Sequence, residues 1–135
     1  MNFKQTGSIK IKLVVIVAIC SVLAFAILSL PKGFKSDLTL IGKGTATVVL
    51  IHDKNLVGAA TTMALLNDVR SDYEDSVEFL AADIVTPEGQ AFMRQQSVGV
   101  IELVVFGPDG TRLQVLRAGI TEQELRTALD ELTDQ

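Results

Sequence analysis

The longest uninterrupted apolar run of the chain lies near its N-terminus. Residues 13–30 carry 18 side chains without a charge, and Ser21 and Ser29 are the only polar interruptions. A helix of this length crosses the hydrocarbon core of a bilayer, and the run lacks the polar face that a helix packed on a core usually shows. The pattern predicts a transmembrane helix over residues 13–30; the alternative is an unusually apolar core helix.

The lysines on either side of this run indicate its orientation. Lys4, Lys10 and Lys12 precede it without an acid, whereas Lys32 and Lys35 follow it. Positive charge is enriched on the cytoplasmic side of membrane proteins. We therefore expect residues 1–12 to be a cytoplasmic flank and the C-terminal part to lie outside, which in a bacterial inner membrane is the periplasm.

A cleaved signal peptide is the competing interpretation, because it also combines a basic start with an apolar stretch. The only Ala-x-Ala site, residues 24–26, lies inside the run rather than after it. The run is also longer than the 7–15 residues usual for a signal peptide. Ile19 precedes Cys20, whereas a lipoprotein signal has a small residue there. The sequence therefore favours a retained anchor.

After a tether over residues 31–45, residues 46–135 alternate between strand-like and helix-like patterns. Continuous apolar runs indicate strands, and apolar residues three or four apart indicate helices. Thr86 and Pro87 are typical of a helix start, and Thr121 with Glu124 forms a capping box. The predicted strands cover residues 47–52, 77–82, 100–106 and 112–117, with a short one at 38–41. The predicted helices cover residues 56–73 and 87–96 and a segment starting at 121. This order favours a mixed α/β sheet with helices on both faces.

Charge and cysteine content exclude several classes of function. The net charge is −4, and no cluster of basic residues after the apolar run could follow a phosphate backbone, so we expect no nucleic-acid partner. Cys20 is the only cysteine, so the chain has no intramolecular disulfide and no thiol pair. No motif for a cofactor or a small-molecule substrate is evident.

The element order, with a Phe-Gly-Pro-Asp-Gly turn at residues 106–110, resembles the thioredoxin-like fold. Residues 48–51 are similar to its central strand, 64–69 to a segment of the following helix, and 77–83 to the next strand with its final Asp. Gly119 and Leu125 fit the start of the last helix. The resemblance covers about residues 46–132, with the first strand and helix of the fold missing or reduced to residues 38–41.

The sequence departs from this family where its chemistry resides. The family's Trp-Cys-Gly-Pro-Cys falls on residues 55–59, so that Leu56 and Ala59 replace both cysteines. Thiol–disulfide exchange needs a thiolate, which neither side chain supplies. The family's cis-proline falls on Ile101, where we expect a trans peptide bond because a cis bond before a non-proline residue costs about 2.5–4 kcal/mol. The resemblance therefore implies a degenerate, redox-inactive member.

No other catalytic or metal-binding group is apparent. His52 is the only histidine, and together with Asp53 it supplies fewer than the three or four ligands of a metal site. No nucleophile motif accompanies it, and residues 57–61 lack the lysine and glycines of a phosphate loop. We expect His52 to be structural, and the acidic last helix to present a solvated face.

The function that these patterns favour is protein binding by a membrane-anchored accessory or assembly subunit of an integral-membrane or periplasmic complex. The alternatives are an oxidoreductase-related protein whose thiols come from a partner, and a purely structural single-pass subunit. The expected binding surface is the vestigial active site, with an apolar patch in place of redox chemistry. We name it the vestigial site; its candidate residues are His52, Asp53, Asn55, Leu56, Val57, Gly58, Ala59, Val100, Ile101 and Glu102.

Overall fold

The computed structural model describes residues 6–28, 33–117 and 119–134 of the 135-residue chain, with side chains from residue 10 onward. The chain divides into two compact units, Met1–Lys32 and Gly33–Gln135, and each is described by itself. We call the second unit the domain.

The first unit is a single helix, α1 (Thr6–Leu28). Its segment Lys10–Leu28 has a mean hydropathy of 2.9, buries no side chain, and is long and apolar enough to cross a membrane. A signal sequence has the same properties, so this criterion fits an anchor and a signal sequence equally. The predicted span ends at residue 30, and residues 29 and 30 lie outside the described part.

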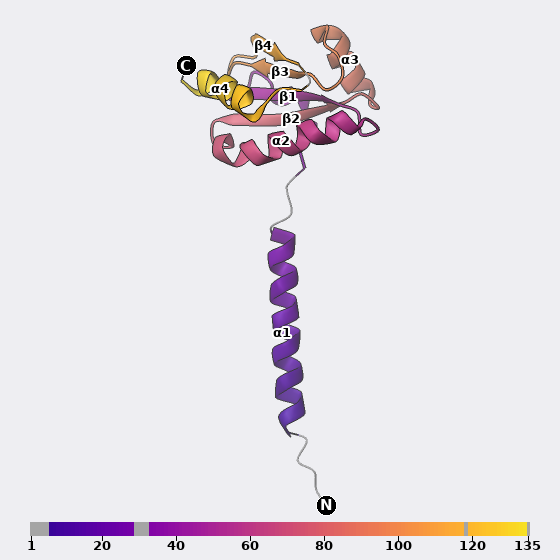
Figure 1. The fold of residues 1–135 in the computed structure, drawn as a ribbon, viewed down its shortest axis with the longest axis vertical. Helices are drawn as coiled ribbons and strands as arrows, with labels where there is room; N and C mark the ends of the chain where they lie inside the picture. Colours follow the sequence, from indigo (N-terminus) through magenta and orange to yellow (C-terminus); the bar gives the residue numbers. More distant parts are fainter. Residues whose placement is uncertain (1–5, 29–32, 118, 135) are drawn as a thin grey trace, which may run out of the picture. The chain divides into compact units, whose positions relative to one another are not determined.

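The domain alternates strands and helices before it ends in a hairpin and a helix (Figure 1). This order confirms the α/β class that the sequence predicts. The elements are η1 (Leu38–Leu40, a 3-10 helix), β1 (Ala46–His52), α2 (Val57–Tyr73), β2 (Val77–Asp83), α3 (Pro87–Gln96), β3 (Leu103–Phe106), β4 (Arg112–Leu116) and α4 (Glu122–Thr133).

The four strands form one mixed sheet in the order β2-β1-β3-β4. β1 and β2 are parallel, with His52 opposite Asp83, whereas β3 is antiparallel to both β1 and β4. β1 lies at the centre and is buried on both faces, which explains its continuous apolar sequence. The loops that follow β1 and β2 therefore leave the sheet at the same end.

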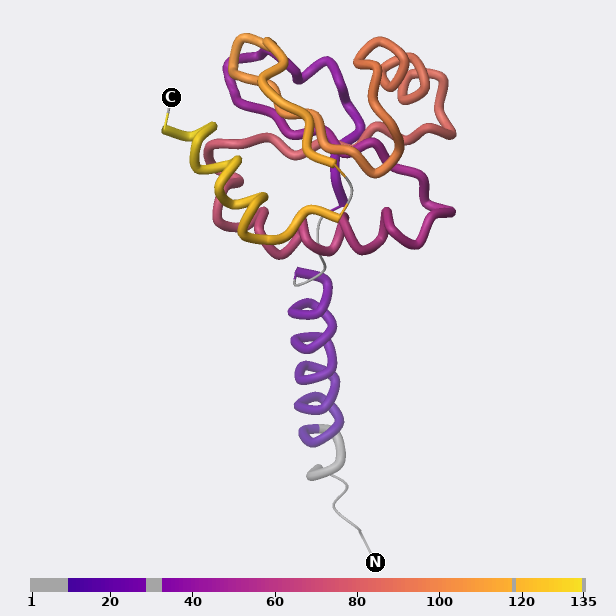
Figure 2. The backbone as a smooth tube through the Cα atoms, turned by 45° about the horizontal axis from the view of Figure 1, so that its top comes forward, coloured from indigo at the N-terminus to yellow at the C-terminus, as the bar shows by residue number. Residues whose placement is uncertain are grey.

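Helices cover the two faces of the sheet (Figure 2). A hydrophobic cluster lies on each face, between the helices and the strands. On one face, Leu66 of α2 and Leu125 and Leu129 of α4 pack against alternate residues of the strands. On the other face, Phe92 of α3 packs against Phe106, with their ring centroids 6.0 Å apart. β1 and β3 thus bury both sets of their alternating side chains, whereas the edge strand β4 is exposed or half-buried throughout.

The predicted helix starts of α3 and α4 are both confirmed. The Thr86 hydroxyl accepts a hydrogen bond from the backbone N–H of Gly89, and Pro87 occupies the first turn. At α4, Thr121 and Glu124 form the reciprocal capping box. The bonds that the Glu124 carboxylate accepts from Thr121 lower the pKa of Glu124, because they stabilise its charged form.

The segment 33–45, expected to be a tether, is held on the domain at several points. Phe34 packs against the cluster under α2, with the Arg70 guanidinium 5.3 Å from its ring centroid. The carbonyl of Lys35 accepts a hydrogen bond of 2.9 Å from the N–H of Ala81, at the outer edge of β2. This contact covers a sheet edge that would otherwise be open.

The strand predicted at residues 38–41 is wrong, because Leu38–Leu40 form η1 with Ile41 as its C-cap. Asp37 accepts hydrogen bonds from the N–H of Thr39 at 3.1 Å and from its hydroxyl at 2.6 Å. An Asp that caps its own following backbone in this way favours a turn over an extended chain. The only trace of an extra strand among the described residues is the bridge at Lys35.

The predicted strand at residues 100–106 is too long, because the observed β3 begins only at Leu103. Residues 100 and 101 form a turn, and Ile101 has a φ of +70°. A left-handed backbone conformation is incompatible with a strand. The peptide bond before Ile101 is trans, since none of the described residues has a cis bond.

Candidate functional site

The first half of the vestigial site is the turn between β1 and α2. Asp53 closes it: its Oδ1 accepts hydrogen bonds from the N–H of Asn55 at 2.9 Å and from Nδ2 of Asn55 at 3.0 Å. The N–H of Leu56 donates to the carbonyl of Asp53 at 3.0 Å. Leu56 is the N-cap of α2 and offers no side-chain cap. The turn therefore presents an apolar residue where a helix usually begins with a polar one.

The second half is the segment that enters β3. The N–H of Ile101 donates to the carbonyl of Ile51 at 2.8 Å, and the N–H of Ile51 donates to the carbonyl of Glu102 at 3.0 Å. The carboxylate of Glu102 accepts a bond of 2.7 Å from the N–H of Gly99. These bonds hold Ile101 at its positive φ, a conformation that costs a β-branched residue on the order of 1–3 kcal/mol. Such strain is concentrated at functional sites.

The two halves meet where Ile101 lies over Gly58. A Cβ atom added at Gly58 would lie 2.9 Å from Cδ1 of Ile101, so the absence of a side chain at Gly58 makes room for Ile101. Beside this contact lies a hollow of about 230 Å³. Its lining comes from the start of α2, from Ile101 and from the segment before α4: Gly58, Thr61, Thr62, Leu65, Ile101, Gly119 and Ile120.

The candidate residues differ in how accessible they are. Val57 and Leu56 are the most relevant, with exposed fractions of 86% and 42%. Ala59 is fully buried, so it lies beneath the surface and is inaccessible to a partner. The exposed candidates are Asn55, Leu56, Val57 and Gly58, and the half-buried ones are His52, Asp53, Val100, Ile101 and Glu102.

Sequence reasoning missed part of this surface. Val85, in the turn after β2, is 56% exposed and leaves the sheet next to the β1–α2 turn, because the N–H of Ile84 donates to the carbonyl of His52 at 3.0 Å. Figures 1 and 2 both place the β1–α2 and β2–α3 turns side by side. Val85 could not be assigned to this surface from the sequence, because that requires knowing that β1 and β2 are neighbours in the sheet. Thr61 and Leu65 were within reach of sequence reasoning, since they lie three and seven positions after Gly58 on one helix face.

The site has little capacity for chemistry of its own. Nδ1 of His52 is buried and has no hydrogen-bond partner among the described residues. In the same part of the chain, no group of three or more His, Cys, Asp or Glu side chains is placed to hold a metal ion. The side chains that reach the surface are mainly apolar, which suits a contact with another molecule.

Comparison with known proteins gives a fold. No protein-family model and no curated protein matches the chain. Several solved structures do match. One comes from a study of the thiol-resolving mechanism in yeast mitochondrial 1-Cys peroxiredoxin; its TM-score is 0.60 and its sequence identity 18%, and the match covers 70% of this chain and 85% of that chain. A second is oxidised thioredoxin O2 from Arabidopsis thaliana, with a TM-score of 0.59 and 15% identity over 70% of this chain and 84% of that chain. A third is an uncharacterised thioredoxin-like protein from Clostridium perfringens, with a TM-score of 0.64 and 13% identity over 72% of this chain and 78% of that chain. The domain has a thioredoxin-like fold.

Within the thioredoxin-like domain, the start of α2 lacks both cysteines of the family's motif. The single cysteine of the chain, Cys20, lies in α1, so no CxxC pair exists. Leu56 occupies the N-cap position and Ala59 the first turn of α2. A dithiol–disulfide exchange by the domain's own residues is therefore impossible.

We expect no disulfide reductase activity from the chain. The Cys20→Ser variant of the full-length protein in detergent should reduce insulin disulfides no faster than buffer with dithiothreitol, because it has no sulfur nucleophile. A thioredoxin measured alongside provides the positive control. A rate above buffer in this cysteine-free preparation would contradict the conclusion that the domain is redox-inactive.

Proposed function

We propose that the chain is a membrane-anchored accessory or assembly subunit whose domain binds a membrane or periplasmic protein complex through the vestigial site. The observation that supports this most is the distribution of exposed apolar side chains. Four large hydrophobic residues are exposed in the described part of the domain. Three of them, Leu56, Val57 and Val85, lie in the two neighbouring turns at one end of the sheet or at the first residue of α2. The fourth, Leu113, is in β4.

The geometry of this end suits a protein partner. An exposed apolar cluster marks an interaction site when it is contiguous and bordered by polar groups. Asp53, Asn55 and Glu102 border it here, and their side chains are engaged in local hydrogen bonds that fix the turns. The hollow at Gly58 and Ile101 offers a place for one apolar side chain of a partner. A preformed surface of this kind loses little conformational entropy on binding.

An anchor would add to the affinity. If α1 is retained in the membrane, partners in the same membrane meet the domain at a raised effective concentration. A modest apolar patch is then sufficient for stable association, since the tether reduces the entropic cost of the encounter.

The test compares two leucines with nearly equal exposure. Leu56→Asp should reduce the amount of co-purifying partner by about tenfold or more, because a charge buried in a desolvated interface costs several kcal/mol. Leu113→Asp is the exposure-matched control, since Leu113 is 43% exposed and Leu56 42%. A partner of the vestigial site should be lost with Leu56→Asp and kept with Leu113→Asp. The measurement is quantitative mass spectrometry of proteins that co-purify with the tagged full-length chain from its native membranes in mild detergent.

Thermal melts of both variants separate binding from folding. Leu113→Asp should lower the free energy of unfolding by about 0.5–1 kcal/mol, because Asp is a poor strand former. Leu56→Asp should cost less or even stabilise the domain, because an Asp at the N-cap of α2 can accept a hydrogen bond from the backbone. If Leu56→Asp unfolds the domain, Leu56 belongs to the core. If both variants stay folded and keep the same partners, the interface lies elsewhere and the proposal fails. Ile101→Asp is a weaker test, because Ile101 is half-buried and its backbone is constrained.

A further inference from the structure

The strand β4 leaves one of its edges unpaired. It lies at the end of the sheet order and pairs only with β3 among the described residues. The opposite end of the sheet is different, because the Lys35 bridge covers β2. An open edge presents a row of backbone N–H and C=O groups to which an extended segment can add as another strand.

The charge of this edge is opposite to that of the rest of the domain. All 16 acidic residues of the chain lie in the domain. Of the 12 basic residues of the chain, 8 lie in the domain and the other four are lysines within residues 1–32. The formal net charge of the domain is therefore −8. Residues 110–121 carry Arg112 and Arg117 and no acid, and no other interval between two acids of the domain has two basic residues.

The two arginines differ in their engagement. Nη1 of Arg112 donates to the backbone carbonyl of Gln96 at 2.6 Å, so it is partly committed to α3. Arg117 is exposed and has no hydrogen bond or ion pair with any residue that the structure describes. Its guanidinium is therefore available to a ligand, and guanidinium binds carboxylates in a planar, bidentate geometry.

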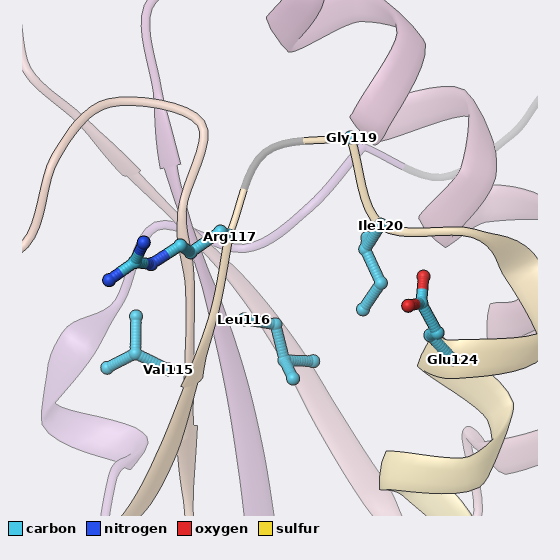
Figure 3. A pocket seen from close by; sticks show the side chains of 6 residues that line it. All are labelled: Val115, Leu116, Arg117, Gly119, Ile120 and Glu124. Carbon is cyan, nitrogen blue, oxygen red and sulfur yellow. The ribbon is translucent and has the colours of Figure 1, made fainter.

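A hollow of about 370 Å³ lies beside the end of β4. Figure 3 shows Val115 and Arg117 on one side of the strand, and Leu116 on the other side, toward Ile120 and Glu124. Val115 packs on the α3 side of the sheet and Leu116 on the α2–α4 side. A ligand strand beside β4 would alternate in the same way, so consecutive side chains would face Arg117 and the space between Leu116 and Ile120.

We propose that the outer edge of β4 binds an extended acidic peptide segment of a partner protein as a fifth strand. An Asp or Glu of that segment pairs with Arg117, and the adjacent residue is apolar and fills the space between Leu116 and Ile120. Glu124 limits the register, because its carboxylate stands at the far side of the hollow and repels an acid placed there. This surface is separate from the vestigial site, although both hollows share Gly119 and Ile120.

Charge also argues against a second copy of the chain as the occupant. Antiparallel pairing of two β4 strands about Gln114 would gather four arginines at one seam and bring together two domains of net charge −8. Both effects oppose association. An acidic segment, in contrast, meets only the basic edge.

The test selects peptides from a phage-displayed library of random dodecamers on the full-length chain in nanodiscs of zwitterionic lipid. Enriched peptides should contain an acid next to a β-branched or aromatic residue and no internal proline. Binding of the best labelled peptide, measured by fluorescence anisotropy, should weaken about fivefold or more with Arg117→Glu and be unchanged with Leu56→Asp. Arg117→Lys should weaken it less than Arg117→Glu, because it keeps the charge and loses the bidentate geometry. Two N-methylated versions of the peptide, one methylated at its odd-numbered and one at its even-numbered residues, give a further test. Only the version whose methyl groups block the N–H groups that donate to β4 should fail to bind, because it loses the ladder hydrogen bonds.

Several results would overturn the proposal. One is the absence of any enriched peptide. Another is a peptide that binds the Arg117→Glu variant as well as it binds wild type. A third is a peptide that still binds in both of its N-methylated versions. A peptide that is lost with Leu56→Asp but not with Arg117→Glu occupies the vestigial site, which supports the proposed function and refutes the edge. Self-association in analytical ultracentrifugation that Arg117→Glu abolishes would show that a second copy occupies the edge.

Discussion

Gly89→Ala is expected to destabilise the domain by about 3 kcal/mol, the upper end of the usual cost of overpacking. A Cβ atom at Gly89 would lie 2.0 Å from the backbone oxygen of Asp83 and 2.5 Å from its carbonyl carbon. Both atoms belong to the end of β2 and cannot move without shifting the sheet or the first turn of α3. Urea denaturation of residues 33–135, followed by circular dichroism, measures the effect.

Gly58→Ala is the matched control, because Gly58 also lies in the first turn of a helix. The only atom that its Cβ would approach closely is Cδ1 of Ile101, the flexible end of a side chain, at 2.9 Å. Alanine also favours a helix over glycine by about 1 kcal/mol, so the two effects should nearly cancel. Equal stability of the two variants would contradict the close approach of α3 to β2.

Local signals were sufficient to predict the helices that begin with a cap. Thr86 and Pro87 define the start of α3, and Thr121 and Glu124 that of α4, because each cap is made by residues within one turn of the chain. The continuous apolar sequence of β1 was likewise informative, since a central strand is covered on both faces.

One error overlooks a local side-chain cap, and the other a contact between segments distant in the sequence. Leu38, Leu40 and Ile41 have the composition of a strand, yet Asp37 turns them into η1, from which they pack on the α3 side of the sheet. Ile101 has a strong strand preference, but its hydrogen bond to Ile51 holds it at a positive φ. Strand propensity alone predicts neither outcome, because the Asp37 cap overrides it in the first case and the contact with β1 in the second.

The two segments that form the vestigial site could be predicted from the sequence, whereas the full set of residues on its surface could not. The family resemblance placed residues 55–59 and Ile101 at one site, and the structure brings Gly58 and Ile101 into contact. Val85 became part of the surface only through the parallel pairing of β1 and β2. The open edge of β4 likewise follows from the strand order, which no local pattern specifies.

If α1 is a retained anchor, its orientation governs which partners can reach either surface. A reporter enzyme that is active only outside the cytoplasm, fused after Gln135, is expected to be active, whereas a fused reporter that is active only in the cytoplasm should be silent. The physical reason is the excess of Lys4, Lys10 and Lys12 on the N-terminal flank over Lys32 and Lys35 after the span. The acids of the domain should have little influence, because orientation follows positive charge rather than net charge.

The control variant replaces the three N-terminal lysines with glutamine. Only Lys32 and Lys35 then flank the span, so a large part of the outside reporter's activity should be lost and the cytoplasmic reporter should become active. The size of the fusion on a denaturing gel distinguishes an anchor from a signal peptide, since cleavage after the Ala-x-Ala site at residues 24–26 would remove the first 26 residues. A full-length fusion that resists carbonate extraction, with an active outside reporter, supports an anchored domain outside the cytoplasm. An active cytoplasmic reporter on the unmodified chain would reverse the orientation, and partners for the vestigial site and for the β4 edge would then have to be sought in the cytoplasm.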